Sequence, residues 1–281
     1  MFCDLHMHST HSDGTMAPRA LVEMARGLGL AAIALTDHDT TSGVAEARAA
    51  GAELGVRVLP GVEISVDWSG RSVHMLGYCF DADTGELQRG LDVLVEGRNR
   101  RNQEMVEKLR ALGVDITHDE VVAEAGGKVV GRPHFARVLL RKGAVADWQE
   151  AFDVYLARGA KAYVERDRFS PVDSVRMIRE AGGVAVLAHP GLLKLRDGET
   201  LDEVVEGLAD AGLRGIECHY SLHDPETTAH CLAIARRFGL VATGGSDFHG
   251  LAKTGIAMGS GGGGLRVPLE CADALEAEAR R

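Results

Sequence analysis

The sequence lacks the features that mark membrane and secreted proteins. No stretch approaches the roughly 18 consecutive apolar residues that a membrane-spanning helix needs. The first ten residues also lack the basic region and the apolar region of a secretory signal. The five cysteines are scattered without a CxxC pair, which argues against a disulfide scaffold or a thiolate zinc site and is typical of free thiols in a reducing compartment. We therefore expect a cytoplasmic protein without membrane association, and nothing in the chain indicates a stable protein partner.

Positive charge is also scarce. The chain has 31 Lys and Arg against 41 Asp and Glu, a formal net charge of −10, which argues against a protein that coats nucleic acids. The charge is uneven, because residues 95–170 hold 14 basic and 12 acidic residues and the remainder carries a net −12. A basic segment beside an acidic body suits an anion-binding flap next to a metal site, although mixed charge on solvated helix faces would give the same counts.

Short apolar runs alternate with amphipathic helical patterns along most of the 281 residues. Helical patterns occupy most of the intervals between the predicted strands. The strands are predicted near residues 2–5, 31–36, 56–66, 73–79, 184–188, 215–219 and 240–244. Such alternation predicts β/α units around a parallel sheet or barrel. Residues 85–165 show helical patterns only. We therefore predict a barrel formed by residues 1–84 and 166–281, with an inserted helical subdomain at 85–165 that caps the barrel for substrate binding.

Histidines and acids gather at the ends of the predicted strands. The carboxyl ends of parallel strands meet at one face of a barrel or sheet, so the side chains that follow them should lie together. So many imidazoles and carboxylates require cations if they are buried at one face. Histidine and carboxylate without thiolate favour Mn, Fe or Zn over an all-oxygen Ca or Mg site. The side chains concerned are those of His6, His8, His38, His189 and His249, of His74 on the strand near residues 73–79, and of the acids Asp13, Asp37, Glu63 and Asp247.

The pair His6 and His8 has the local geometry that such a site needs. Two residues apart on an extended strand, their side chains point to the same side. A His-x-His pair is weak support by itself, and any single histidine could equally be an ordinary core or surface residue. The recurrence of the pattern at several strand ends is what argues for a metal centre.

A resemblance to the PHP family (polymerase and histidinol phosphatase) is carried by the segments HMHSTHSDGT, LTDHDT, PGVEIS, VHMLGY, LAHP and GGSDFHG. It covers essentially the whole chain and implies a distorted seven-stranded β/α barrel with a trinuclear metal centre. By this resemblance, the first metal would be held by His6, His8, Glu63 and Asp247, the second by the bridging Glu63 with His74 and His189, and the third by Asp13, His38 and His249. Some family members have a histidine at the position of Asp13, and His11 matches no ligand position.

The helical block narrows the resemblance to a subgroup that dephosphorylates nucleoside 3′,5′-bisphosphates and is linked to 5′→3′ trimming of short RNA. The matching segments are GRNRRNQ, GRPHFARVL, KAYV and GIECHYSLHDP. Basic side chains bind phosphate through charge-assisted hydrogen bonds, and a histidine at a helix start can donate to the same anion. Each of them could also be an ordinary surface or loop residue. The candidate substrate-binding residues are Arg98, Arg101, Asn102, Arg132, His134, Lys161, Ser221 and His223.

We therefore predict a phosphoesterase that uses two or three divalent cations, Mn foremost and Fe or Zn as alternatives. The resemblance gives Glu63, Asp13 and His38 catalytic roles through the cations they hold, and Asp37 or Asp39 could protonate the leaving oxygen. The predicted substrate is a nucleoside 3′,5′-bisphosphate, which would lose its 3′-phosphate, or a short 5′-phosphorylated RNA. The alternatives are histidinol phosphate, for which the basic insert is superfluous, and a non-catalytic metal-binding module, against which the complete ligand set argues.

Overall fold

The computed structural model describes residues 1–82, 85–127, 129–166 and 168–281. Its strands form one sheet in the order β7-β6-β5-β4-β3-β2-β1-β8. They are β1 (Phe2–Asp4), β2 (Ala32–Leu35), β3 (Arg57–Trp68), β4 (Arg71–Tyr78), β5 (Val184–Leu187), β6 (Gly215–Tyr220), β7 (Val241–Gly245) and β8 (Val267–Pro268). The first seven strands lie within about two residues of the ranges predicted from the sequence.

The sheet closes between β1 and β7. The N–H of Leu5 donates to the carbonyl of Gly244 (3.1 Å), and the N–H of Asp247 donates to the carbonyl of His6 (2.8 Å). The predicted β/α barrel is therefore confirmed, with β1 to β7 as its seven strands. The two-residue β8 is an addition that the sequence did not indicate, and it pairs antiparallel with β1.

One strand of the barrel runs against its neighbours, and this brings a further side chain to the functional end. β4 is antiparallel to both β3 and β5. It follows β3 through a tight turn in which Ser69 and Gly70 both have positive φ (50° and 82°), as two-residue hairpins require. Because β4 starts where the parallel strands finish, His74 near its beginning lies opposite Ser65 near the end of β3.

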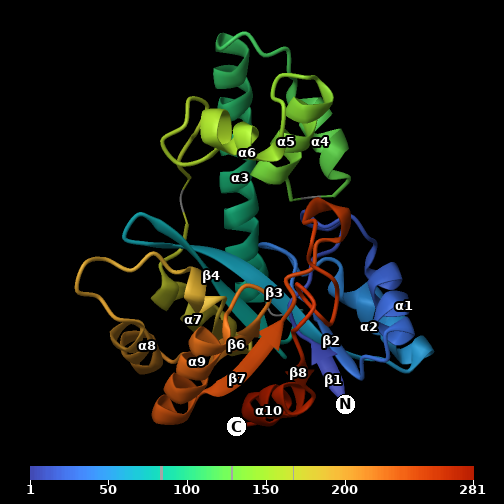
Figure 1. The fold of residues 1–281 in the computed structure, drawn as a ribbon, viewed down its shortest axis with the longest axis vertical. Helices are drawn as coiled ribbons and strands as arrows, with labels where there is room; N and C mark the ends of the chain where they lie inside the picture. The colour runs from blue at the N-terminus through green and yellow to red at the C-terminus, as the bar shows by residue number, and fades with distance from the viewer. Residues whose placement is uncertain (83–84, 128, 167) are drawn as a thin grey trace.

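Helices surround the barrel, and α10 lies across the end that also holds the two termini (Figure 1). Their bounds are α1 (Pro18–Gly27), α2 (Val44–Leu54), α7 (Pro171–Glu180), α8 (Leu201–Asp210), α9 (Pro225–Phe238) and α10 (Glu270–Ala279). α10 packs Ala272 and Leu275 against the apolar barrel interior, so that end is filled. The opposite end is left for the site. Within the described segments, no helix combines the length and the hydropathy that a membrane span requires.

Local sequence explains where these helices begin. α1, α7 and α9 start with Pro18, Pro171 and Pro225, and proline is favoured in the first turn because its missing N–H has no helical partner there. The side chains of Ser170 and Asp224 accept hydrogen bonds from free N–H groups of the first turn. Proline and capping residues in the sequence therefore mark where these helices begin.

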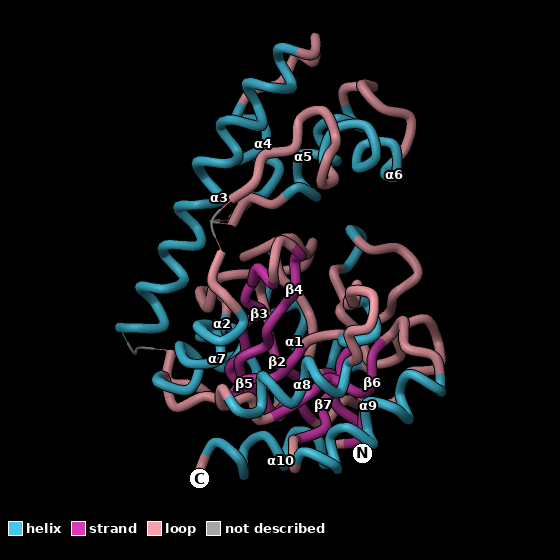
Figure 2. Tube along the Cα trace, turned by 90° about the vertical axis from the view of Figure 1, so that its left-hand side faces the viewer, coloured by secondary structure: helices cyan, strands magenta, loops and turns pink. Residues whose placement is uncertain are grey.

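The helix α3 (Gly85–Ala111) extends away from the barrel and carries the helical block at its far end (Figure 2). Its first half buries Leu87, Leu91 and Leu94 in the core that surrounds α7 and the barrel. Its second half buries Met105 and Leu109 in a separate core with α4 (His118–Ala125) and α5 (Arg132–Arg141). The helical content predicted for this block is observed. Its treatment as a separate domain stays a prediction, because α3 belongs to both cores and the boundary at 84 lies outside the described residues.

The last helical segment of this block is not one regular α-helix, although the sequence shows an ordinary helical pattern there. A single turn, α6 (Trp148–Glu150), continues as a π-helical segment, η1 (Ala151–Leu156). The N–H of Ala157 donates to the carbonyl of Phe152, five residues earlier (2.8 Å). Apolar periodicity does not distinguish this wider helix from an α-helix. π-helical turns are rare and occur often at functional sites.

Candidate metal centre

The side chains predicted as metal ligands come together at the open end of the barrel, around Glu63 on β3. Its Oε2 atom lies 3.3 Å from His6 Nε2 and 3.2 Å from His8 Nε2. Its Oε1 atom lies 2.8 Å from His74 Nδ1 and 3.1 Å from His189 Nε2. The two oxygens of one buried carboxylate thus face two different groups of imidazoles, as a bridging ligand would.

Three groups of side chains offer ligand atoms that lie within 4.8 Å of one another. They are His6, His8, Glu63 and Asp247; His38, Glu63 and His74; and His8, Asp13, His38 and His249. The first group has the members predicted for the first metal. The second contains His38 where the resemblance implies His189, and the third adds His8. The assignment of each ligand to a particular metal therefore stays a prediction.

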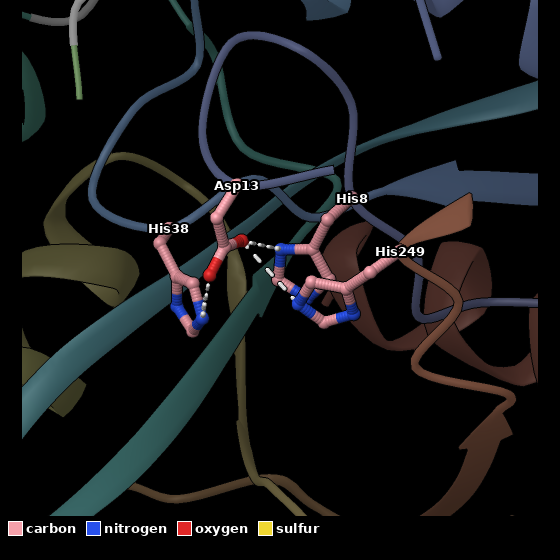
Figure 3. Close-up of side chains that lie close together, drawn as sticks. All are labelled: His8, Asp13, His38 and His249. Atoms are coloured by element: carbon pink, nitrogen blue, oxygen red, sulfur yellow. Dashed lines mark ion pairs between the residues drawn. The ribbon is translucent and has the colours of Figure 1, made fainter. Parts of the chain in front are cut away.

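Figure 3 shows the third group, in which the carboxylate of Asp13 lies between imidazoles on two sides. Its Oδ1 atom is 3.3 Å from His249 Nε2 and 3.8 Å from His8 Nδ1, and its Oδ2 atom is 3.9 Å from His38 Nε2. Burial opposes the charge on Asp13, but the surrounding imidazoles outweigh it and hold the pKa of this carboxyl well below its usual value. Asp13 therefore presents an anion to the group.

Unpaired buried atoms indicate that the cluster is built for cations. His6 Nε2, His8 Nε2, His38 Nδ1 and Glu63 Oε2 are buried and have no hydrogen-bond partner among the residues that the structure describes. Buried polar atoms without a partner are rare and require an explanation such as a bound ion. Divalent cations would satisfy all four atoms, and a donor set of imidazole and carboxylate fits Mn, Fe or Zn.

A carboxylate that the sequence analysis missed orients two of the ligands. Glu217 on β6 is completely buried; its Oε1 atom accepts a hydrogen bond from His6 Nδ1 (2.9 Å), and its Oε2 atom accepts one from the N–H of His189 (2.7 Å). The first contact turns the lone pair of His6 Nε2 towards the cluster, which is how outer carboxylates tune metal-binding histidines. The signal in the sequence was an acid in the middle of the apolar strand GIECHY.

Replacing Glu217 by glutamine should weaken metal binding about ten- to a hundredfold. The amide keeps the volume but offers only one acceptor atom, so it cannot hold both His6 and the backbone of His189. Metal titration followed by elemental analysis measures the effect. Glu206→Gln, on the exposed face of α8, is the matched control and should bind metal like the wild type. Unchanged affinity in Glu217→Gln would remove this orienting role.

Two further residues that were not predicted hold Asp247. Its Oδ2 atom accepts hydrogen bonds from the hydroxyl of Tyr220 (2.9 Å) and from Lys253 Nζ (2.5 Å), which leaves Oδ1 facing His8 Nε2 at 3.2 Å. Tyr220 ends β6 and Lys253 follows β7, so this arrangement exists only in the folded barrel. Neither residue type nor spacing marks these contacts in the sequence.

The turns that carry these residues are locally strained. Asp39, His189 and Asp247 follow β2, β5 and β7 and have positive φ values of 54°, 28° and 56°. For residues with a side chain this region costs roughly 1–3 kcal/mol, and such residues concentrate at functional sites. The strain is therefore located where the strands deliver their ligands.

The two acids considered as proton donors are both engaged elsewhere. Asp37 accepts hydrogen bonds from the N–H and hydroxyl of Ser9 (2.7 and 2.6 Å) and from the hydroxyl of Ser12 (2.5 Å), and so fixes the loop that carries Asp13. Burial opposes the charge on Asp39, but Arg98 and Arg166 hold the pKa of this carboxyl below its usual range. Both acids are thus held by contacts within the protein, and the suggestion that one of them protonates the leaving oxygen stays a prediction.

Arginines line a cavity that adjoins the ligand cluster. Asp13, His38 and His74 form one wall, and the other carries Arg98, Arg101, Arg132, Arg166 and Arg168. The first three arginines were predicted to bind substrate. The last two were missed, because the segment ERDRF lies at the end of the helical block and shows no phosphate-binding pattern. Asp39 is paired with Arg98 Nε (2.7 Å) and with Arg166 (3.3 Å), so one carboxylate faces several guanidinium groups.

Arg101 has no carboxylate partner among the residues that the structure describes. It is 4% exposed, its Nε donates to Asn102 Oδ1 (2.9 Å), and its Nη2 has no hydrogen-bond partner in the described part of the chain. Burial, together with repulsion from Arg98 and Arg166, lowers the pKa of Arg101 well below its usual value. A buried guanidinium with unused donors is costly unless an anion joins it. The cavity therefore favours a phosphate or carboxylate beside the ligand cluster.

His134 can contribute a neutral donor to the same region. It is fully buried, and its Nδ1 accepts a hydrogen bond from the N–H of Gly131 (2.9 Å). Burial lowers its pKa to about 4 and outweighs the attraction of Asp13. At neutral pH its proton is therefore on Nε2, which is buried without a partner and is free to donate.

Of the remaining substrate-binding candidates, three make hydrogen bonds within the protein and one is exposed, so their role in binding substrate stays a prediction. Asn102 donates to the carbonyl of Val130 (3.1 Å), and the side chain of Lys161 is exposed and does not line the arginine cavity. Ser221 donates to the carbonyl of Ser246 (2.6 Å), and His223 bridges the carbonyl of Cys218 and the N–H of Gly191 (3.0 and 3.1 Å). Their neighbours in the chain, Tyr220 and Leu222, line the ligand cavity instead.

The geometry can be compared with known families and structures. The family model described as PHP domain matches residues 4–165, more than half of the chain. The chain belongs to the PHP family. The resemblance inferred from the motifs is confirmed, and this PHP protein is an enzyme that hydrolyses phosphate esters with the help of metal ions.

The relatives of this PHP protein act on different phosphate esters. It is 39% identical to the 3′,5′-nucleoside bisphosphate phosphatase of Chromobacterium violaceum, over 91% of this chain and 90% of that protein. It is 35% identical to the 5′-3′ exoribonuclease Rnm of Escherichia coli (88% and 84%). It is 33% identical to the phosphoribosyl 1,2-cyclic phosphate 1,2-diphosphodiesterase of Eggerthella lenta (89% and 95%).

A solved structure agrees with the fold. A metal-dependent phosphoesterase from Bifidobacterium adolescentis superimposes with a TM-score of 0.89 at 33% identity, over 98% of this chain and 95% of that one. The barrel and the helical block therefore occur together in that structure as well.

Proposed function

We propose that this PHP phosphoesterase removes the 3′-phosphate of nucleoside 3′,5′-bisphosphates. The observation that carries the proposal is the pairing of two anion sites in adjoining positions. Asp13, His38 and His74 of the ligand cluster line the same cavity as Arg98 and Arg101. A substrate with two phosphates on one ribose would present one to the cluster and the other to the arginines. The name of the Chromobacterium violaceum relative agrees with this assignment.

Different residues would act on the two phosphates of the substrate. Two or three divalent cations, Mn foremost, would supply the activated water and the charge neutralisation that phosphate hydrolysis needs. Arg101 and Arg132 bind the 5′-phosphate, and Asp39 keeps Arg98 oriented through its bond to Nε. His134 donates from Nε2 without adding a charge. In the reaction the oxygen of water would bond to phosphorus while the bond between phosphorus and O3′ breaks. One proton of the water would stay on the released phosphate, and O3′ would take up the other to become a hydroxyl.

The same bond cleavage would trim RNA from its 5′ end. In a 5′-phosphorylated RNA, breaking the bond between phosphorus and O3′ of the first nucleotide releases a nucleoside 5′-monophosphate. The remaining strand keeps the phosphate at its own 5′ end and becomes a new substrate for the same two sites. The name of the Escherichia coli relative supports short RNA as a second substrate.

Histidinol phosphate fits the arginine cavity poorly. It carries a single phosphate and a cationic amine, and the wall of Arg98, Arg101 and Arg132 would repel the amine while leaving the guanidinium groups unpaired. A cytoplasmic location, where such nucleotides occur, remains a prediction.

The decisive measurement compares substrates that differ only at the 5′ position. With Mn-loaded enzyme, kcat/KM for adenosine 3′,5′-bisphosphate should greatly exceed that for adenosine 3′-monophosphate, and the products should be 5′-AMP and phosphate. RNA with a 5′-phosphate should be degraded much faster than RNA with a 5′-hydroxyl. Histidinol phosphate and a ribose 1,2-cyclic phosphate complete the panel. Equal rates with and without the 5′-phosphate, or faster hydrolysis of either rival, would overturn the proposal.

A further inference from the structure

The cavity of the ligand cluster has an apolar rim that phosphate binding leaves unexplained. Its volume is about 360 Å³, and it is lined by Trp148, Leu192 and Leu222 as well as by the ligands. These side chains are 36%, 47% and 57% exposed. They come from three separate segments: the start of α6, the turn after β5 and the loop after β6. The fold therefore gathers large apolar groups from distant parts of the chain above the cluster.

The position of Trp148 depends on the unusual helical segment beside it. Asp147 caps α6 by accepting a hydrogen bond from the N–H of Glu150 (2.8 Å). The ring of Trp148 lies 5.5 Å from that of Phe152, tilted by 37°, and Phe152 belongs to the π-helical η1. Phe152 lines the arginine cavity while Trp148 lines the ligand cavity. The two rings thus connect the two places where the phosphates of the substrate would bind.

We propose that Trp148 is a stacking platform for the nucleobase of the substrate, with Leu192 and Leu222 packing at the edge of the base. The proposal rests on the function proposed above. With the 3′-phosphate at the cluster and the 5′-phosphate at the arginines, the base is the part of a nucleoside bisphosphate that needs an apolar surface. An exposed indole in the same cavity offers that surface, and each stacked base gains free energy without base-specific hydrogen bonds.

A second aromatic cavity is a weaker candidate for the base. It adjoins the arginines through Arg132 and Arg168 and contains Trp68 and Tyr163. The guanidinium group of Arg71 lies over the ring of Trp68 (5.6 Å) and that of Arg132 over the ring of Tyr163 (6.0 Å). A base would have to displace these cations, whereas in the described part of the chain no cation is recorded over Trp148.

Stacking without hydrogen-bond readout also predicts the specificity. Adenine and guanine substrates should be hydrolysed with similar kcat/KM, and both should exceed cytosine and uracil because a purine covers more of the indole. A strong preference between adenine and guanine would require polar contacts that a stacking platform does not provide.

Kinetics on a substrate without a base test the proposal. Trp148→Ala should lower kcat/KM for adenosine 3′,5′-bisphosphate by on the order of tenfold. It should leave hydrolysis of the abasic tetrahydrofuran 3′,5′-bisphosphate unchanged. Trp148→Phe should retain most of the activity, and an unchanged Tm and metal content show that the fold is intact.

Equal losses on both substrates would overturn the proposal. If the wild type hydrolyses both substrates equally well, the base is not bound and the stacking proposal fails while the proposed function stands. If neither is hydrolysed, the proposed function fails as well.

Fluorescence locates the base independently, because the chain has two tryptophans. Trp68→Phe leaves Trp148 as the only reporter, and Trp148→Phe leaves Trp68. At concentrations of 5′-AMP that inhibit hydrolysis, emission should be quenched in Trp68→Phe and not in Trp148→Phe. Ribose 5-phosphate, which lacks the base, should quench neither. Quenching of Trp68 alone would place the base in the second cavity and overturn the proposal, and so would inhibition without quenching of either residue.

Discussion

Replacing Glu63 by glutamine should remove bound metal from the cluster and lower kcat by at least about a thousandfold. Both oxygens of Glu63 face imidazoles, Oε2 towards His6 and His8 and Oε1 towards His74 and His189. An amide keeps the shape but loses the charge and one acceptor, so two sites that share this ligand should empty together. The loss follows from the several kcal/mol that metal ions supply to phosphate hydrolysis.

Asp13→Ala is the matched comparison for this result. Asp13 belongs to the group with His8, His38 and His249 and to neither of the groups that contain Glu63. Elemental analysis should therefore find that Asp13→Ala keeps metal where Glu63→Gln loses it, with Tm showing that both variants are folded. Full metal occupancy in Glu63→Gln would contradict the bridging role of this carboxylate.

The ligand cluster could be predicted from the sequence because its logic is local. His6 and His8 are two residues apart on an extended segment, and most of the other candidates follow strands whose carboxyl ends must meet in a barrel. Glu63 and His74 lie within β3 and β4, and their place in the cluster was implied by the motifs. Glu217, Tyr220 and Lys253 were missed for the opposite reason. Each of them acts by contacting a ligand from another strand, and such contacts depend on packing that residue type and spacing do not record.

The arginine cavity could be predicted from the sequence only in part. Along α3 one buried face continues from Leu94 through Arg98 and Arg101 to Met105, with the spacing of an amphipathic helix. The polar residues on this apolar stripe were a readable signal that these arginines are buried rather than exposed. Arg166 and Arg168 gave no such signal, because neither belongs to a helix or a strand.

The excess of positive charge in the arginine cavity predicts a second large effect, on substrate hydrolysis and on stability, when Arg101 is replaced. Arg101→Met should lower kcat/KM for adenosine 3′,5′-bisphosphate about ten- to a hundredfold, since a charge-assisted hydrogen bond to a phosphate contributes roughly 1.5–3 kcal/mol. Hydrolysis of adenosine 3′-monophosphate, which has no 5′-phosphate, should barely change. The same substitution should raise the free energy of unfolding by about 1–4 kcal/mol, because it replaces a buried guanidinium with an apolar side chain of similar length. That guanidinium is repelled by Arg98 and Arg166 and has no carboxylate partner among the described residues.

Arg100→Met separates this effect from a general loss of charge on α3. Arg100 is adjacent in the chain but exposed, so its replacement should change neither kcat/KM nor the unfolding free energy appreciably. Inorganic phosphate should raise the Tm of the wild type and of Arg100→Met more than that of Arg101→Met, because an anion in the cavity binds only the folded protein. Equal kinetic losses on the bisphosphate and the monophosphate would assign Arg101 to the reacting phosphate. Lower stability of Arg101→Met would show that the guanidinium is compensated in the free enzyme, and the argument that this cavity awaits an anion would fail.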